Sequence, residues 1–186
     1  MPSPLDALDW PVRTDRLVLR RLAEGDMPAI FAFRLQPEVA EWVGGKVTDL
    51  EDLTERFGEG ETAVIVEHDG QVIGDLMVKV QDAWAQREVA EQAAGAEAEL
   101  GWTLDPAYQG RGFATEAMRA LLGICFDGLG LHRVVAICFT DNEPSWRLME
   151  RLGMRREAHT VKESLHRDRG WLDAYTYAML AEEWRG

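Results

Sequence analysis

The stretch Asp105-Pro-Ala-Tyr-Gln-Gly-Arg-Gly-Phe-Ala-Thr-Glu-Ala117 carries the strongest structural signal in this sequence. It follows a predicted strand, crosses a glycine-rich turn and opens an amphipathic helix, with Gly110 and Gly112 on either side of Arg111. The start of a helix presents N–H groups without intrahelical partners and about half a positive charge. Because glycine lacks a side chain, an anion can approach these groups closely. The stretch therefore predicts a phosphate or pyrophosphate site.

Two other phosphate-binding loops are excluded by the spacing. No Gly-Lys-Ser/Thr follows, as a P-loop requires, and the Gly-x-Gly-x-x-Gly fingerprint of dinucleotide-binding folds is not completed. Taken alone, the stretch is also compatible with an ordinary helix start that binds nothing.

The composition is typical of a globular protein. Hydrophobic residues make up 46% of the 186 residues, which argues against disorder and suits one domain with a sizeable core. No apolar run approaches the roughly 20 residues that span a bilayer, and the first residues lack the features of a signal peptide. We expect a soluble, cytoplasmic protein without membrane association, a single domain over 1–186 with 1–13 as a loose N-terminal arm.

The charge is distributed unevenly. The formal net charge is −13; residues 1–100 carry 9 Lys/Arg against 21 Asp/Glu, whereas residues 101–160 carry 7 of each. The neutral segment thus coincides with the predicted phosphate site. An acidic surface disfavours stable nucleic-acid binding. It suits a cationic acceptor such as an amine, although a purely solvating role explains the charge equally well.

The two cysteines, Cys125 and Cys138, lie inside apolar patterns and are expected to be buried, inert thiols. With four scattered histidines they form no metal-binding spacing, so we expect no metal.

Apolar periodicity and turn residues predict alternating strands and helices. Strands are expected at 17–22, 62–67, 72–80, 97–104, 132–139, 154–166 and 171–180. Asp69-Gly70 predicts a hairpin turn, Asp26 is expected to cap the first helix, and Thr48 with Glu51 to form the capping box of the second. Residues 82–96 read as a short helix or a mobile loop. This order predicts a mixed sheet with helices on both faces.

The phosphate stretch resembles the acetyl-CoA motif of the GNAT superfamily of N-acetyltransferases, Gln/Arg-x-x-Gly-x-Gly/Ala, here Gln109, Gly112 and Ala114. Further segments resemble the family in its own order. They are Glu99–Pro106 (its fourth strand), Asp141–Ser145 (its Asn-x-x-Ser helix start), Arg151–Met154 (its Lys/Arg-x-Gly-Phe/Met turn), and Arg16–Arg20 with Trp171–Tyr177, which resemble the ribosomal-protein (RimJ/RimL-like) branch. Together these matches cover residues 14–185.

The resemblance implies the family's α/β fold, with a mostly antiparallel six- to seven-stranded sheet whose fourth and fifth strands splay apart. Pantetheine would lie in the resulting V against the fourth strand, and pyrophosphate on the glycine loop. Residues 82–96 are then an insertion between the third and fourth strands. The implied cofactor-binding residues are Trp102, Thr103, Leu104, Gln109, Gly110, Arg111, Gly112, Phe113, Ala114, Thr115 and Asn142.

The resemblance further implies direct transfer of an acetyl group from acetyl-CoA to a primary amine, either a protein N-terminus or a small molecule. A lysine-type amine, with a pKa of about 10.4, must lose a proton before it attacks. Glu99 is the candidate base, acting through water, with Glu97 as its substitute. Ser145 is the candidate donor to the departing thiolate, and Tyr175 or Tyr177 are weaker candidates. The alternative interpretations are that Glu99 is an ordinary surface glutamate at a strand start and that Ser145 is an ordinary serine at the cap or first turn of its helix.

The acceptor pocket is expected between the first two helices, the 82–96 insertion and the final hairpin, with Trp42, Trp84 and Trp171 as its wall. Asn142 is expected to cap its helix and contact pantetheine. A non-catalytic acyl-CoA-binding sensor and an enzyme acting on tRNA or ribosome-bound substrate are the competing functions. Whether the protein forms a homodimer stays open.

Overall fold

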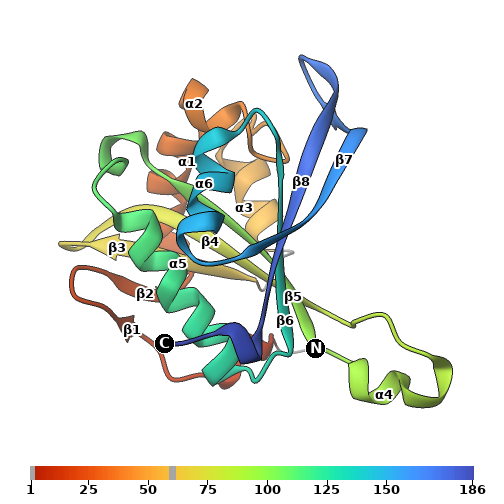
Figure 1. Cartoon of the computed structure of the whole chain (residues 1–186). Helices are drawn as coiled ribbons and strands as arrows, with labels where there is room; N and C mark the ends of the chain where they lie inside the picture. Colours follow the sequence, from red (N-terminus) through yellow and green to blue (C-terminus); the bar gives the residue numbers. More distant parts are fainter. Residues whose placement is uncertain (1–2, 59–61) are drawn as a thin grey trace.

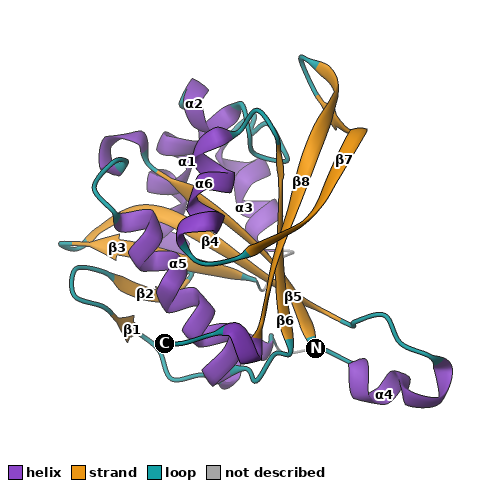
Figure 2. Cartoon of the chain, in the orientation of Figure 1, coloured by secondary structure: helices purple, strands orange, loops and turns teal. Residues whose placement is uncertain are grey.

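A single open sheet runs through the computed structural model, which describes residues 3–58 and 62–186 (Figures 1 and 2). Within these residues the strand order is β1-β2-β3-β4-β5-β6-β8-β7, and every neighbouring pair is antiparallel except β5 and β6. The strands are β1 (Val12–Arg13), β2 (Val18–Arg21), β3 (Ala63–His68), β4 (Gln71–Gln81), β5 (Glu97–Leu104), β6 (Arg133–Phe139), β7 (Arg155–His166) and β8 (Gly170–Leu180). The mixed, mostly antiparallel sheet is confirmed.

The predicted count of six to seven strands is wrong, because the sheet has eight. The additional strand, β1, is two residues long and belongs to the N-terminal arm. Such a short segment cannot show the alternation that reveals a strand in sequence.

Helices cover both faces of the sheet. The helices of the described residues are α1 (Met27–Arg34), α2 (Pro37–Ala40), α3 (Leu50–Gly58), α4 (Ala90–Ala93), α5 (Phe113–Gly123) and α6 (Glu143–Arg151). In Figure 1, α5 and α6 lie in front of the sheet, and α1 and α3 lie behind it. The front core contains Leu100 and Met118, and the back core contains Phe33 and Ile65.

Strand alternation decides which side chains reach which face. Val78, Ala98 and Leu100 belong to the core under α5 and α6. Because successive side chains of a strand point to opposite faces, Glu99 and Thr103 lie on the α1 face. Arg34 of α1 donates to Thr103 Oγ1 at 3.3 Å, which agrees with this assignment.

The sheet splits between its two parallel strands. β5 and β6 pair only over Glu97–Glu99 and Arg133–Val135. Beyond this point β5 stays paired with β4 as far as Leu104, and β6 stays paired with β8 as far as Phe139. The two strands therefore open into a V, as the resemblance implied.

Local capping differs from the prediction at two helices. The Asp26 carboxylate makes no cap bond to α1; it accepts hydrogen bonds from Ala23 N at 2.8 Å and from Arg20. At α3 the cap lies one residue later than expected, because Asp49 Oδ1 accepts from Asp52 N at 2.9 Å and Asp52 Oδ2 accepts from Thr48 N at 3.1 Å. In the first case the Asp26 carboxylate is already occupied by Arg20 and by the backbone N–H of Ala23.

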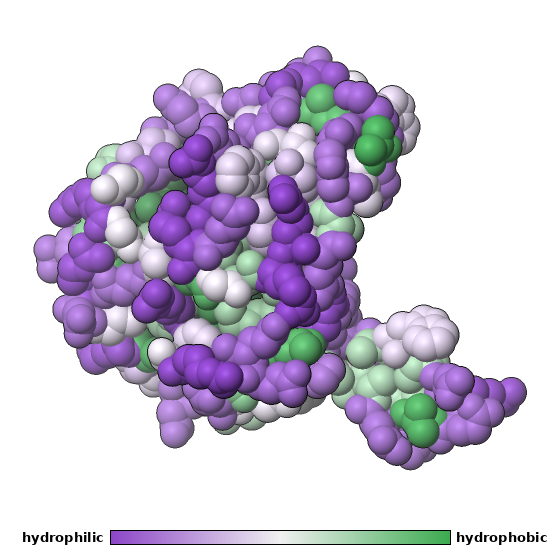
Figure 3. Space-filling model, viewed as in Figure 1, coloured by the Kyte–Doolittle hydropathy of each residue, from purple (hydrophilic) through white to green (hydrophobic). Residues whose placement is uncertain are grey.

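The N-terminal arm is packed rather than loose. Of the segment 1–13, residues 1–2 lie outside the described part. Leu5 is buried in the front core, and Trp10 Nε1 donates to Leu5 O at 2.8 Å. The 82–96 segment contains the short helix α4 and projects from the end of the sheet where β5 begins (Figures 1 and 3).

Candidate active site

The glycine-rich stretch forms an anion cradle at the start of α5. Gly112 precedes the helix with a φ of 82°, and Gly110 has a φ of 71°, a region that side-chain-bearing residues rarely adopt. The first hydrogen bond of the helix runs from Glu116 N to Gly112 O. In the described part of the chain, no protein acceptor meets the backbone N–H groups of residues 111–115. These groups fit an anionic phosphate.

Arg16, from the segment before β2, braces this loop. Its Nη1 donates to Arg111 O at 3.0 Å, and its Nε donates to Glu116 Oε2 at 2.7 Å. Glu116 also accepts from Thr14 Oγ1 at 2.6 Å. Burial raises the pKa of Glu116, but the hydrogen bonds from Thr14 and Arg16 outweigh it and hold the pKa below its ordinary value. No local pattern in the sequence predicts this contact, because Arg16 and Glu116 lie 100 positions apart.

Side chains of the loop have distinct roles. Gln109 Nε2 donates to Leu104 O at 3.3 Å, as expected of a residue that holds the loop to β5. Phe113 is buried in the front core, so only its backbone N–H can serve a ligand. The Arg111 guanidinium is exposed and lies 4.8 Å from the Phe113 ring centroid.

The β5 arm of the V has an unused backbone edge. Asp105 N donates to Ile73 O at 2.8 Å, so odd-numbered residues of this strand hydrogen-bond toward β4. Since neighbouring residues in a strand hydrogen-bond in opposite directions, Leu100 and Trp102 direct their N–H and C=O groups toward the gap. An extended ligand in the V would pair with these groups.

Thr103 is a correction to the predicted cofactor set. By the same alternation its backbone faces β4, with Asp75 as its partner in the register. Its hydroxyl is bound by Arg34 on the α1 face. Leu100, which the sequence prediction omitted, takes the position on the gap side instead.

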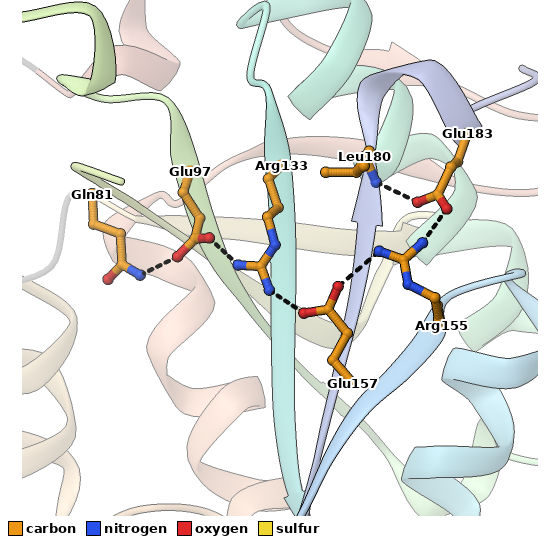
Figure 4. A network of polar contacts seen from close by, with 7 residues as sticks. All are labelled: Gln81, Glu97, Arg133, Arg155, Glu157, Leu180 and Glu183. Carbon is orange, nitrogen blue, oxygen red and sulfur yellow. Dashed lines mark hydrogen bonds and ion pairs between the residues drawn. The ribbon is translucent and has the colours of Figure 1, made fainter. Parts of the chain in front are cut away.

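The carboxylates of Glu99 and Glu97 differ in their hydrogen-bond and ion-pair partners. Glu97 accepts from Gln81 Nε2 at 2.9 Å and forms an ion pair with Arg133 (Figure 4). Glu99 is half-buried at the point where β5 and β6 separate, and no described residue binds its carboxylate. Glu99 therefore has a free carboxylate at the point where the V begins to open, whereas Glu97 is held in structural contacts.

Figure 4 shows that Glu97 starts a chain of ion pairs at the closed end of the V. Arg133 of β6 joins Glu97 of β5 to Glu157 of β7, and Arg155 joins Glu157 to Glu183. The chain links three strands beside the last residues that β5 and β6 share. It holds the strands together where the sheet begins to split.

Ser145 lies against the other arm of the V. Burial raises the pKa of the Cys138 thiol of β6 to about 11, and a hydrogen bond from the Ser145 hydroxyl works in the opposite direction. Cys125 is likewise buried, which raises its pKa to about 12. Both thiols are thus buried, as predicted.

Asn142 does not cap α6 with its side chain, contrary to the prediction. Its carbonyl accepts from Ser145 N at 3.1 Å instead. The amide is left available at the V, next to Ser145. Tyr177 is a poor acid, because its hydroxyl donates to Glu150 at 2.9 Å, and burial raises its pKa to about 12.

The three tryptophans expected to wall an acceptor pocket do not come together. Trp42 packs against Phe139 and His166, with centroids 6.1 and 5.7 Å away, where the β7–β8 turn meets the end of α2. Trp84 is 90% exposed on the 82–96 segment, which projects from the opposite end of the sheet (Figure 1). Trp171 is exposed on β8.

Two hollows accompany the V. One, of about 800 Å³, follows the outer side of α5 beside Arg119 and Trp184, and none of the predicted catalytic or cofactor residues lines it. A smaller cavity of about 190 Å³ lies on the α1 face, next to Asp75 and Met77 of β4. In the β4–β5 ladder, Asp75 pairs with Thr103 and Met77 pairs with Gly101.

Neither a metal centre nor a membrane span is found in residues 3–58 and 62–186. No group of three or more His, Cys, Asp or Glu side chains there could hold a metal ion. No helix in this part is long and apolar enough to cross a bilayer.

Comparisons with known proteins agree with this geometry. The family model described as an acetyltransferase (GNAT) domain matches residues 16–155. The uncharacterized N-acetyltransferase YnaD of Bacillus subtilis is 31% identical over 179 residues, covering 93% of this chain and 98% of YnaD. The crystal structure of a GNAT-family acetyltransferase from Bacillus anthracis superposes with a TM-score of 0.79 at 29% identity, covering 94% of this chain and all of that one.

The chain belongs to the GNAT family of N-acetyltransferases and is an acyltransferase. The RimJ protein of Mycobacterium smegmatis, solved in complex with CoA-disulfide, has a TM-score of 0.76 at 24% identity and covers 91% of this chain and 84% of its own. At that identity the likeness shows a shared fold. The predicted family and its ribosomal-protein structural neighbours are confirmed.

Proposed function

We propose that the protein transfers an acetyl group from acetyl-CoA directly to a primary amine. The observation that carries this proposal is one continuous track of unused backbone groups. It runs from Leu100 and Trp102 in the V to the N–H cradle of residues 111–115 at the start of α5. An extended pantetheine arm that ends in a pyrophosphate matches both the shape and the chemistry of this track.

The residues of the track have defined tasks. The N–H groups of residues 111–115 hold the pyrophosphate. Leu100 and Trp102 pair with the pantetheine amides, and Asn142 reaches the same arm from α6. Acetyl-CoA supplies the acyl group as an activated thioester.

Three groups of the chain then act on the reaction. Glu99 receives the proton of the incoming ammonium through a water molecule, which leaves a neutral amine to attack the thioester carbonyl. A gap-facing N–H of β5 stabilises the negative charge that develops on the carbonyl oxygen. Ser145 donates a hydrogen bond to the sulfur as the C–N bond forms and the C–S bond breaks. The proton that the nitrogen loses on forming the amide passes through water to the departing thiolate, which leaves as the free thiol.

The positions of Glu99 and Ser145 support this division of labour. Glu99 lies on the α1 face of the sheet, and Ser145 begins α6 on the front face. The amine thus approaches from one side of the V while the thiolate leaves toward the other. The group that accepts the proton of the amine and the group that donates to the sulfur therefore lie on opposite faces of the sheet.

Calorimetric titration with acetyl-CoA tests the cofactor site. Gly112→Val is expected to abolish binding, because a side chain at this positive φ strains the loop and crowds the cradle. Gly130→Val is the matched control: its φ is 66° and no atom lies near its Cβ position, so it carries similar strain away from the loop. Equal affinity in wild type and Gly112→Val contradicts the site.

Release of free thiol in the presence of an amine separates turnover from binding. We expect thiol release that depends on both acetyl-CoA and amine, and an N-acetylated product of matching amount. Tight binding of acetyl-CoA without release for any amine would contradict the proposed reaction.

A further inference from the structure

The cavity of about 190 Å³ beside β4 has the chemistry of an anion site. Two arginines line it, Arg34 from α1 and Arg56 from α3, together with apolar side chains that include Val47, Phe57 and Met77. Lined by guanidinium groups and apolar surface, it suits a short chain that ends in a planar anion.

Arg34 is held so that one side of its guanidinium stays free. Its Nε donates to Asp75 Oδ1 at 3.0 Å, and its Nη2 donates to Asp75 Oδ2 at 2.5 Å. Burial raises the pKa of Asp75, and the guanidinium of Arg34 opposes this rise. Both carboxylate oxygens of Asp75 are occupied, while no described residue binds Nη1 of Arg34.

Arg56 is held in a similar way. Its Nε donates to Asp52 Oδ1 at 2.8 Å and its Nη2 to Lys46 O at 3.1 Å, and no described residue binds its Nη1. Gly45, which also lines the cavity, makes room for this group: a Cβ there would lie 1.9 Å from Arg56 Nη1. The backbone at position 45 therefore permits the guanidinium to reach the cavity.

The cavity offers little to a positively charged group. Asp75 is its only acidic lining residue among those described, and Arg34 already occupies both of its oxygens. The net charge of −13 suggests a cationic acceptor for the molecule as a whole, but the charged groups with unused hydrogen-bonding capacity here are guanidinium donors. An ammonium would meet two guanidinium groups, with the Thr62 hydroxyl as the side-chain acceptor on the described lining.

The cavity adjoins the acceptor side of the V. Arg34 contacts Thr103, which lies two residues along β5 from Gly101 and four from Glu99. At 3.3 Å per residue these separations are about 7 and 13 Å. A carboxylate bound at about 3 Å from the guanidinium would then lie on the order of 10 Å from an amine placed between Gly101 and Glu99.

We propose that this cavity binds a carboxylate of the acceptor, so that the substrate is an amino acid-like amine whose carboxylate lies several bonds from the reacting nitrogen. The inference rests on the proposed function for the position of the amine. The cavity's preference for a carboxylate over an uncharged chain end stands on the cavity alone.

A binding experiment tests the cavity without turnover. NMR spectra that resolve arginine Nε–H signals are recorded while the full-length protein is titrated with 4-aminobutyrate, 6-aminohexanoate or the matching butylamine and hexylamine. Arg56→Gln and Arg34→Lys assign the two signals. We expect the carboxylated compounds to shift both signals and the alkylamines to leave them unchanged. Equal shifts with both, or none with either, overturn the proposal.

Thiol release with the same compounds tests the consequence for catalysis. We expect kcat/KM to be about tenfold higher for the carboxylated amines than for their alkylamine partners, mainly through KM. Glycine, whose carboxylate is too close to its nitrogen, should gain no such advantage. A ratio within about twofold for all pairs overturns the proposal while leaving the enzyme intact.

Variants separate a specific contact from general charge. Arg56→Gln should reduce the preference for carboxylated amines about fivefold or more and leave acetyl-CoA affinity unchanged. Gly45→Ala should do the same, because it displaces the guanidinium without removing its charge. Arg147→Gln is the control, since Arg147 also pairs with an acidic residue four positions away, on α6. An equal effect of Arg147→Gln contradicts the proposal.

The two proposals fail differently. Arginine signals that respond to carboxylates, with no thiol release for any amine, would contradict the acetyl-transfer reaction and support the cavity. Thiol release without any preference for carboxylated amines would support the reaction and contradict the cavity.

Discussion

At the scale of single residues, Glu97 and Glu99 show how neighbours on one face of one strand acquire different roles. Glu97 is bound by Gln81 and Arg133, so its carboxylate is fixed and its charge is neutralised. Glu99 faces Lys79 and Val135 in the strand register and has no hydrogen-bond partner among the described residues. A general base needs a free carboxylate, and of these two residues Glu99 is the one whose carboxylate is not held by a neighbour.

We expect Glu99→Gln to lower kcat by about tenfold or more while leaving acetyl-CoA affinity unchanged. The loss should grow below neutral pH, because more of the amine is then protonated and must be deprotonated in the site. A pH profile of thiol release is the measurement, and Glu88→Gln on the projecting segment is the control. Wild-type rates in Glu99→Gln would remove Glu99 from the mechanism.

Ser145→Ala should lower kcat more than it raises KM for acetyl-CoA. The Ser145 hydroxyl lies beside Cys138. In the proposed mechanism it stabilises only the negative charge that develops on the departing sulfur, and this charge is not yet present in the bound substrate. Steady-state kinetics with varied acetyl-CoA separate the two effects. If KM rises and kcat is unchanged, Ser145 is a cofactor contact.

At the scale of elements, the start of α5 depends on the segment between β1 and β2. Glu116 in the first turn of α5 accepts hydrogen bonds from Thr14 and Arg16, and Arg16 also holds the carbonyl of Arg111. The anion cradle is therefore positioned by residues from the other end of the sequence. A change at Arg16 should consequently alter cofactor binding although Arg16 belongs to no cofactor motif.

Glu116→Gln should lower the free energy of unfolding by about 1–3 kcal/mol near neutral pH. Because the folded-state pKa of Glu116 is depressed below its ordinary 4.5, its contribution is present above that value and is lost as pH falls through the folded pKa. Denaturant unfolding of both proteins between pH 7 and pH 3 measures this. The difference should shrink in the acid range; a constant difference would show that ionisation of Glu116 is not involved.

At the scale of the whole molecule, the ion-pair chain in Figure 4 joins strands from three parts of the sequence at the closed end of the V. Arg133 and Glu97 are both mostly buried, so loss of Arg133 leaves Glu97 without an ionic partner, whereas loss of Glu97 leaves Arg133 paired with Glu157 alone. The spacing of the two arms of the V depends on this junction.

Arg133→Gln should lower the free energy of unfolding by about 1–3 kcal/mol, a moderate value because the pair keeps some contact with water. The double variant with Glu97→Gln should be less destabilised than the sum of the single variants, since no unpaired charge remains. The same cycle for the exposed pair Glu143–Arg147 should give a coupling below about 0.5 kcal/mol. Equal couplings in both cycles would contradict a special role for the junction.

Much of the fold was predictable because its signals are local. The Asp69-Gly70 turn lies between two β-branched runs, and both residues have the positive φ that such a hairpin needs. Helix α6 (Glu143–Arg151) begins within Asp141–Ser145, the segment that resembles the family's helix start, and the left-handed Gly153 follows its end. In the candidate site the anion cradle was equally accessible, because its glycines and the helix they precede adjoin in sequence.

The predictions failed for side chains whose hydrogen-bond partners lie on another element of the fold. Asp26 was expected to cap α1, but Arg20 and Ala23 bind its carboxylate. Thr103 was assigned to the cofactor, yet its backbone faces β4 and its hydroxyl meets Arg34. Strand direction and register determine such contacts, and a single strand read in isolation does not reveal which edge stays open.

The order of strands and helices, the glycine turn before α5 and the family could be predicted from short segments, since they depend on spacing and backbone freedom within those segments. Three features became visible only in the folded chain: Glu99 is free while Glu97 is held, Arg16 braces the start of α5, and Arg34 and Arg56 line one cavity. Hydrogen bonds and ion pairs form between groups a few ångströms apart, and folding alone brings residues separated by tens of positions to that distance.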